Sequence, residues 1–240
     1  MSEMVDDGGV FADSIKRIGN GKTIKKVIFD VRDNIGGSDY AWLHVLQAIM
    51  KDTLILRRML AFKDSELMHH YINGLRDKYE IESIYPKINT LPFLNDLNVI
   101  CLADTSYFAP DPNSLQYAGK IYILQNLGSF SAAQSITAFS KQIPQLVSVG
   151  VPTGNIAGAG FGPWTFQLGE SKYTFNIDID SDITDASNAK DVFQDRPEIE
   201  VYPTIDEMIE MNNYGRILNK RGGQFLFNHD YLFKKVVEME

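Results

Sequence analysis

Apolar and polar residues along this chain form short apolar runs that alternate with longer amphipathic stretches. Residues 27–31 (Val-Ile-Phe-Asp-Val) have the composition of a strand, and apolar residues recur at helical spacing from Trp42 to Ile49. The same order of strand, turn and helix returns over residues 120–142, and a further strand is predicted at 146–149. Strands that alternate with helices through short turns favour an α/β fold with a largely parallel sheet.

The pattern between and after these units predicts further elements. Residues 33–37 are expected to form a turn, because Asn-Ile-Gly-Gly interrupts the apolar run. Residues 83–112 contain four prolines and are expected to be mostly long loops, apart from residues 99–102 (Val-Ile-Cys-Leu), whose apolar run predicts a buried strand. The remaining predicted elements are a strand at 54–60, a helix at 64–79, a half-exposed strand at 173–180, a short strand at 199–201 and a closing helix at 231–239.

Composition excludes several classes of protein. The 240 residues are 44% hydrophobic and 22% charged, which is typical of a globular chain. The net charge of −8 argues against a nucleic-acid partner, since nucleic-acid affinity needs clustered Lys and Arg. The single cysteine, Cys101, excludes an internal disulfide and a Cys-rich zinc site. With no run of 18 apolar residues, no membrane span is expected.

Two other motifs resemble cofactor or metal sites, but each lacks a part that such a site needs. Residues 158–162 (Gly-Ala-Gly-Phe-Gly) lack the flanking strand and helix of a dinucleotide-binding fingerprint. Residues 178–182 resemble the start of a calcium loop, but Ile183 stands where that loop needs glycine. We therefore expect no cofactor and no metal.

Two strand-turn-helix units carry the candidate chemistry, one ending in Gly36-Gly37 and the other in Ser131. A serine at the first turn of a helix lies near free backbone N–H groups and the positive end of the helix dipole. A Gly-Gly turn on a neighbouring strand can bring a second N–H close to the same point. Local chemistry alone favours a plainer interpretation, in which Ser131 caps its helix and the glycines turn the chain.

Four segments together resemble the S41 serine peptidases, the family of the C-terminal (tail-specific) processing proteases and the tricorn protease core. Residues 27–37 resemble the signature hydrophobic-Asp-Leu-Arg-x-Asn-x-Gly-Gly, and residues 129–134 resemble the nucleophile motif Ser-x-Ser-Ala-x-Glu. Residues 149–154 are similar to Val-Gly-x-x-Thr-x-Gly, and residues 195–201 to Val-x-Pro-Asp-hydrophobic-x-Val. The ordered set is more specific than any one motif.

The resemblance implies a ClpP/crotonase-like superhelix of ββα units with Ser131 as the nucleophile. The oxyanion hole would be the backbone N–H of Ala132 together with that of Gly36 or Gly37. We therefore expect the two glycines within about 6 Å of Ser131, because such donors must converge on one oxygen. Two residues of the first motif, Asp30 and Arg32, match positions that brace the strand rather than take part in catalysis.

The general base is not evident. In the processing proteases the general base is a lysine in the segment after the nucleophile helix. Here Asn155, which follows Gly154, stands in that segment and cannot take a proton. Gly154 and Asn155 are expected to contact the substrate. Lys141 lies ten residues beyond Ser131, too far along the helix. The tricorn-like branch uses an upstream histidine and a glutamate, and Asp191 falls near the position of that glutamate. The four histidines, beginning with His44, are expected to lie on surfaces or in packing contacts.

These observations lead to a serine-type endopeptidase that cleaves peptide or protein substrates through an acyl-enzyme on Ser131. The alternative is an inactive peptide-binding or scaffolding domain, with Gln134 and Asn155 as signs of lost catalysis. A crotonase-type acyl-CoA enzyme is disfavoured by the acidic composition. Expected boundaries are a lead-in at 1–23 that ends a missing upstream segment, a catalytic domain at 24–205 and a helical extension at 206–240. A homo-oligomer is left open, and so is the cellular compartment. The family resemblance implies a secreted or cell-envelope protein if an upstream export signal exists, and a cytoplasmic protein otherwise.

Overall fold

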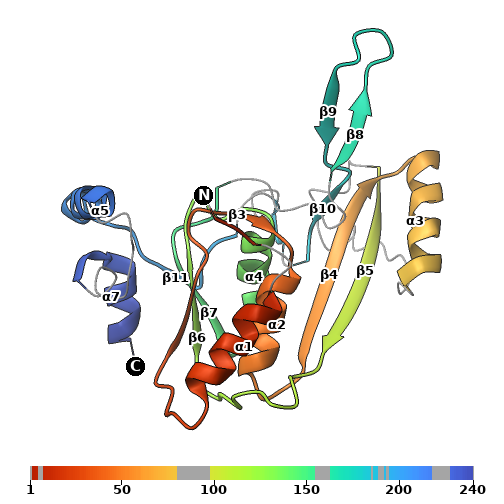
Figure 1. Ribbon diagram of the computed structural model, residues 1–240. Helices are drawn as coiled ribbons and strands as arrows, with labels where there is room; N and C mark the ends of the chain where they lie inside the picture. Colours follow the sequence, from red (N-terminus) through yellow and green to blue (C-terminus); the bar gives the residue numbers. More distant parts are fainter. Residues whose placement is uncertain are drawn as a thin grey trace.

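A four-stranded parallel sheet forms the centre of the fold in the computed structural model (Figure 1), which describes residues 2–4, 8–79, 98–154, 163–184, 186–188, 192, 195–217 and 228–239. Its strand order is β11-β7-β6-β2, and all three pairings are parallel. The strands are β2 (Val27–Asp30), β6 (Ile121–Gln125), β7 (Leu146–Gly150) and β11 (Ile199–Glu200). The prediction of an α/β fold with a largely parallel sheet is confirmed.

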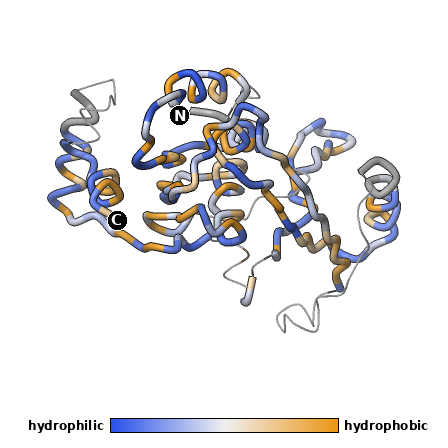
Figure 2. Tube along the Cα trace, turned by 90° about the horizontal axis from the view of Figure 1, so that it is seen from below, coloured by the Kyte–Doolittle hydropathy of each residue, from blue (hydrophilic) through white to orange (hydrophobic). Residues whose placement is uncertain are grey.

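Helices cover both faces of this sheet. The residues of β6 alternate between its two sides, and the residues on each side are buried against a helix. Ile121 and Ile123 pack with α2 (Tyr40–Ile49) and α4 (Ala132–Ser140). Tyr122 and Leu124 face the other way, against Leu232 of α7 (Tyr231–Glu238). In Figure 2, hydrophobic and hydrophilic positions are interspersed along the chain.

Helix α1 (Gly8–Gly19) lies against α2 and was not predicted from the sequence. A Cβ placed on Gly8 would lie 2.7 Å from the carbonyl oxygens of Tyr40 and Ala41, so the two helices approach too closely there for any other residue. Helix α5 (Ile205–Ile217) precedes α7. In the described part of the chain, no helix has the length and apolar composition needed to cross a membrane.

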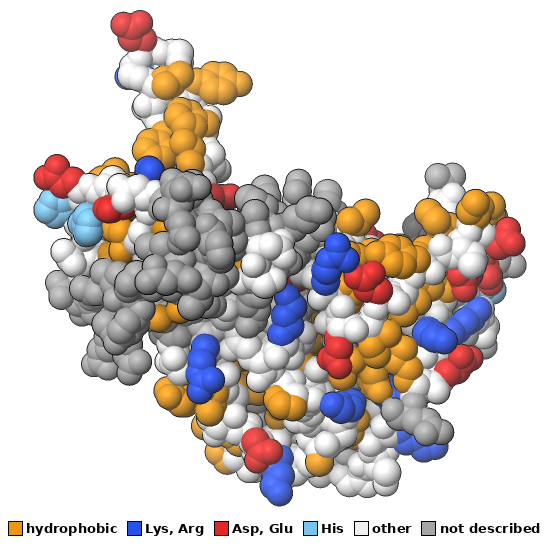
Figure 3. All heavy atoms as spheres, turned by 180° about the vertical axis from the view of Figure 1, so that it is seen from behind, with side chains coloured by type: hydrophobic (Ala, Val, Ile, Leu, Met, Phe, Trp, Pro, Cys, Tyr) orange, Lys and Arg blue, Asp and Glu red, His pale blue; other side chains and the backbone are white. Residues whose placement is uncertain are grey.

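A second, antiparallel sheet lies beside the main one, with strand order β10-β4-β5. Its strands are β4 (Leu54–Lys63), β5 (Val99–Phe108) and β10 (Asp180–Asp182), and α3 (Glu66–Tyr79) packs on it through Met68 and Ile72. Strands β8 (Trp164–Gln167) and β9 (Thr174–Ile177) form a hairpin that projects from the body of the molecule (Figures 1 and 3).

Two sequence predictions about loops are wrong. The predicted strand at 99–102 is confirmed, but residues 103–108 continue it rather than form a loop, because β5 contains no proline and pairs residue by residue with all of β4. Residues 34–37 are also a strand, β3 (Asn34–Gly37), rather than a turn. It pairs with β1 (Ser2–Met4), which lies some thirty residues earlier in the chain, and local sequence gives no sign of that partner.

Candidate active site

The turns that follow β2 and β6 are joined by the side chain of Asn126. Its Oδ1 accepts hydrogen bonds from the backbone N–H of Asp33 and of Gly128, both at 3.0 Å, and its Nδ2 donates to Asp33 Oδ1 at 2.9 Å. The N–H of Phe130 also donates to the carbonyl of Asn34 at 2.9 Å. Because β2 and β6 are parallel neighbours, their carboxyl ends meet at one edge, and these bonds hold the first two sequence motifs together there.

Ser129 belongs to this framework and is unsuited to be a nucleophile. Its side chain is fully buried, its hydroxyl donates to the carbonyl of Val31 at 2.8 Å, and the N–H of Asn126 donates to it at 3.1 Å. Both hydrogen-bonding roles of the hydroxyl are therefore used within the fold.

Ser131 immediately precedes α4 in an unusual backbone conformation, with φ 53° and ψ −124°. Such angles are costly for a residue with a Cβ, and they persist only where the surrounding structure enforces them. The side chain makes no capping hydrogen bond, so the plainer interpretation of Ser131 as a helix cap is wrong. Its hydroxyl remains available beside the start of the helix.

Gly36 lies directly against Ser131. A Cβ at Gly36 would stand 2.5 Å from the Ser131 Cβ and 2.8 Å from the Ala132 nitrogen, and Gly36 itself has φ +93°. Only glycine satisfies both conditions. The N–H of Gly36 donates to Asn34 Oδ1 at 2.9 Å, and Gly37 follows with φ 133°. The structure thus brings together Gly36, Ser131 and Ala132 as the sequence led us to expect.

A buried carboxylate, Asp195, contacts α4 through Gln134 and contacts Lys141 at the end of the same helix. Its Oδ2 accepts from Gln134 Nε2 at 2.8 Å, and its Oδ1 accepts from Lys141 Nζ at 3.3 Å. Burial raises the pKa of Asp195, while Lys141 and Gln134 act to lower it. The sequence analysis did not predict this contact. The one sequence feature that could have pointed to it is Gln134, which stands where the nucleophile motif of the family has a glutamate.

The third motif lies beside the nucleophile turn. The N–H of Gly154 donates to the carbonyl of Leu127 at 3.2 Å, and a Cβ on Gly154 would lie 2.5 Å from that oxygen. Thr153 exchanges two hydrogen bonds with Asp195, since its N–H donates to the Asp195 carbonyl and its hydroxyl accepts from the Asp195 N–H. The other two candidates, Asn155 and Asp191, lie outside the described residues.

None of the hydrogen bonds found among the described residues joins a lysine or histidine to Ser131. Lys141 pairs with Asp195, as above. Three histidines lie near carboxylates, namely His69 with Asp64, His70 with Glu66 and His229 with Glu210. The fourth, His44 on α2, lies beside the ring of Tyr40, and its Nδ1 is buried with no partner among the described residues.

Arg32 ties the first motif to the carboxyl-terminal helix. Its guanidinium contacts the carboxylates of Asp30 and Asp230, each at 2.6 Å from Nη2, and Asp230 also accepts from Phe233 N–H at the start of α7. Burial would lower the pKa of Arg32, but the two carboxylates raise it overall. This arrangement braces the strand end. The described residues contain no cluster of His, Cys, Asp and Glu suited to a metal ion.

Comparison with solved structures shows the same fold in several proteases. Mature CPAF is 18% identical, with a TM-score of 0.59 over 94% of this chain and 48% of that one. The photosystem II D1 C-terminal processing protease is 14% identical, with a TM-score of 0.50 over 92% of this chain and 46% of that one. A chain described as a peptidase from Parabacteroides merdae is 16% identical, with a TM-score of 0.58 over 89% and 58%.

The chain therefore spans about half the length of these structures. No curated protein sequence matches it. The family model for peptidase family S41 matches residues 1–197, which is most of the chain. With its fold and its ordered motifs, this chain belongs to peptidase family S41.

Proposed function

We propose that this chain is the catalytic part of a serine peptidase that cleaves peptide bonds through an acyl-enzyme on Ser131. The observation that carries the proposal is the contact of Gly36 with Ser131, whose backbone is strained and whose hydroxyl makes no cap. Strain of this kind clusters at functional sites, where the surrounding structure pre-organises a side chain.

In the proposed reaction, Ser131 Oγ forms a bond to the carbonyl carbon and its proton passes to a base. The negative charge that develops on the substrate oxygen is stabilised by two backbone N–H groups and by the positive end of the α4 dipole. The tetrahedral adduct collapses as the amine leaves with a proton. Water then attacks the acyl-enzyme, which releases the acid and restores the hydroxyl.

The two donors are assigned to Ala132 and Gly37. Ala132 begins α4, and the first N–H groups of a helix have no partner within it. The N–H of Gly36 already donates to Asn34 Oδ1, which leaves the amide of Gly37 as the second donor.

The general base is assigned to a group outside the described residues, since no described lysine or histidine is hydrogen-bonded to Ser131. Asp191 keeps its place as the acidic residue that would orient such a base, and Gly154 with Asn155 would contact the substrate. Gln134 donates to a buried carboxylate, which gives this residue a structural role whether or not the chain is catalytic. An inactive peptide-binding domain remains the competing function, favoured by the lack of a general base hydrogen-bonded to Ser131 in the described part of the chain.

Hydrolysis of unfolded casein by the purified chain tests the proposal. General-base catalysis contributes about 10²- to 10⁴-fold, so we expect slow turnover, well below the roughly 1–10³ per second of ordinary enzymes. This slow activity should disappear in Ser131→Ala and persist in Ser135→Ala. Equal activity in the wild type and Ser131→Ala would contradict the proposal.

A further inference from the structure

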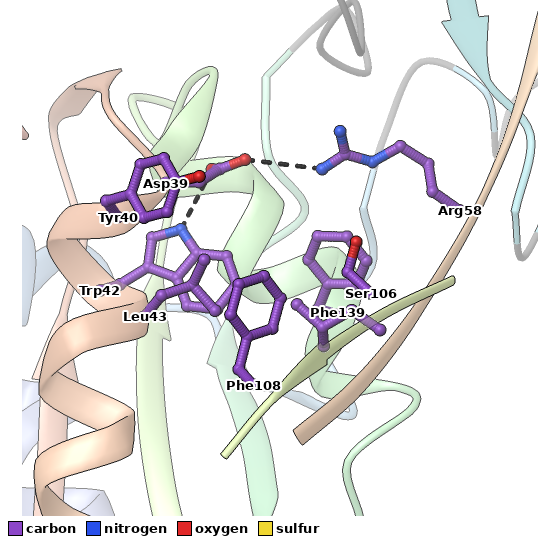
Figure 4. Close-up of a pocket in the computed structure, with 9 residues that line it drawn as sticks. Asp39, Tyr40, Trp42, Leu43, Arg58, Ser106, Phe108 and Phe139 are labelled. Atoms are coloured by element: carbon purple, nitrogen blue, oxygen red, sulfur yellow. Dashed lines mark hydrogen bonds and ion pairs between the residues drawn. The ribbon is translucent and has the colours of Figure 1, made fainter. Parts of the chain in front are cut away.

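A cavity of about 170 Å³ lies between α2, α4 and the β4–β5 pair (Figure 4). Its walls come from three parts of the fold and combine apolar and aromatic side chains with the polar side chains of Asp39, Arg58 and Ser106. The apolar and aromatic wall residues include Trp42, Leu43, Leu56, Phe108 and Phe139. Leu56 and Phe108 belong to neighbouring antiparallel strands, so the second sheet closes one side of the cavity.

A loose ion pair between Asp39 and Arg58 crosses the cavity, as Figure 4 shows. Arg58 Nη2 lies 3.5 Å from Asp39 Oδ2, and Arg58 Nε lies 3.9 Å from Asp182 Oδ2. The guanidinium also lies 5.2 Å from the ring centre of Phe139. Because both ion pairs are long and partly exposed, little free energy is lost when a ligand separates them.

The cavity is adjacent to the nucleophile. Asp39 is the third residue after Gly36, which places it within about 11 Å of the residue that touches Ser131. Phe139 is the eighth residue after Ser131 and lies about 12 Å away along α4. A substrate that extends one or two residues from Ser131 spans this separation together with the length of its side chain, because each extended residue adds about 3.3–3.6 Å.

We propose that this cavity binds one large apolar side chain, aromatic or branched, of the substrate residue at or next to the bond that Ser131 attacks. The inference rests on the proposed function. An enclosed apolar cavity of about 150 Å³ has room for benzene, so by volume alone 170 Å³ admits a phenyl or isobutyl group, whose apolar surface would contact the apolar and aromatic wall residues. Two carboxylates face one guanidinium at the rim, and this excess negative charge disfavours an acidic side chain.

Binding can be measured without any reaction at Ser131. In a Ser131→Ala, Trp164→Phe chain, Trp42 is the only tryptophan left and forms part of the cavity wall. We expect N-acetyl-phenylalanine amide to change its fluorescence saturably, whereas N-acetyl-alanine amide and N-acetyl-aspartate amide should not. A response equal for all three compounds, or none for the phenylalanine compound, would overturn the inference.

Reactive probes then connect the cavity with the nucleophile. In a diphenyl phosphonate of an amino acid, Ser131 Oγ forms a bond to phosphorus and one phenoxide leaves, which takes up the proton as phenol. We expect the phenylalanine probe to label Ser131 roughly 10- to 200-fold faster than the alanine probe, the range that hydrophobic pockets reach. Equal labelling rates would contradict the cavity assignment while leaving the proposed function intact. Binding of the phenylalanine compound without labelling of Ser131 would instead contradict the proposed function and leave the cavity assignment intact.

Matched variants on one strand complete the test. Leu56 faces the cavity, and its neighbour Ile55 is exposed on the opposite face of β4. Leu56→Phe should reduce the preference for the phenylalanine probe to less than a third, and Ile55→Phe should leave it unchanged. If Leu56→Phe does not fold, Leu56→Ala serves in its place and should admit a naphthyl probe that the wild type rejects. Equal effects of the Leu56 and Ile55 variants would overturn the inference.

Discussion

Gly36 and Ser131 are in such close contact that a Cβ on the glycine would stand 2.5 Å from the Cβ of the serine. The contact joins residues 95 positions apart, one from the end of β3 and one from the start of α4. Substitution of either residue therefore reports on the geometry of the other.

Gly36→Ala is expected to disrupt the site and the fold together. The new methyl group would overlap Ser131 and the nitrogen of Ala132, and alanine is strained at φ +93°. We expect a loss of stability of about 2 kcal/mol or more and no labelling of Ser131 by a fluorophosphonate. The matched control is Gly74→Ala, in an exposed part of α3 with open space at the Cβ, which should stabilise the chain by about 0.5–1 kcal/mol. Urea denaturation measures both, and a harmless Gly36→Ala would contradict the contact.

The backbone strain at Ser131 predicts opposite effects for two small substitutions. Ser131→Ala keeps the strained φ of 53° and loses no capping bond, so its stability should lie within about 0.5 kcal/mol of wild type. Ser131→Gly relieves the strain and should raise stability by about 1 kcal/mol, while both variants lose labelling. Thermal denaturation distinguishes the two. A loss of about 1 kcal/mol in the alanine variant would instead indicate a helix cap.

Removal of Asp230 is expected to be strongly destabilising. The Arg32 side chain is 7% exposed and that of Asp230 is 3% exposed, so Asp230→Ala leaves a buried guanidinium with only the Asp30 carboxylate and removes the cap of α7. We expect a loss of about 3–5 kcal/mol in chemical denaturation. The exposed pair of Arg196 and Glu200 is the control, and its removal should cost about 0.5 kcal/mol or less.

Gln134→Glu would restore the residue of the family motif and should destabilise this chain in a pH-dependent way. Asp195 already has a pKa raised by burial, and a second carboxylate beside it would raise the pair further. A carboxyl group whose pKa is higher in the folded than in the unfolded chain favours folding less as pH rises. Its contribution to the free energy of unfolding is fully present below the unfolded-state pKa of about 4 and is lost as pH rises through the folded-state pKa. The loss relative to wild type should therefore grow from pH 4 to pH 7.

The control for that experiment is Gln134→Ala, which removes the hydrogen bond without adding charge. Loss of that hydrogen bond also raises the pKa of Asp195, so the loss of stability in this variant should grow with pH, but less steeply than in Gln134→Glu, which adds a second carboxylate. Urea denaturation at several pH values compares the two variants, and a pH-independent loss in Gln134→Glu would show that it does not meet Asp195.

The central strands and helices were predictable from their apolar patterns. β6 and β7 are buried at every position and stand out as mostly apolar runs, whereas α2 and α4 show apolar residues at helical spacing. β3 was missed because Asn-Ile-Gly-Gly looks like a turn locally, and its partner β1 lies far away in the sequence. The conformation of Ser131 was missed for a similar reason. A serine at this position favours a helix cap. In the structure, Gly36 packs closely against Ser131, whose backbone is strained and whose side chain makes no capping hydrogen bond.

The proximity of the first two motifs was predictable from the family resemblance, but the bonds that maintain it were not. Asn126 joins the turns through contacts with Asp33, 93 residues away, and Gln134 meets Asp195 across 61 residues. Such pairs leave no periodic pattern in the sequence. The cavity under Arg58 was missed likewise, since its walls come from four elements that only the fold brings together.

The most direct test of the account is the site of reaction with a fluorophosphonate. The purified 240-residue chain is incubated with the reagent, digested, and mapped by mass spectrometry, with Ser131→Ala as the control. The account predicts slow modification of Ser131 alone in the wild type and none in the control, because only Ser131 combines an uncapped hydroxyl with the start of α4 and a facing glycine. Modification of Ser129 or Ser135, or an adduct that persists in Ser131→Ala, would contradict it.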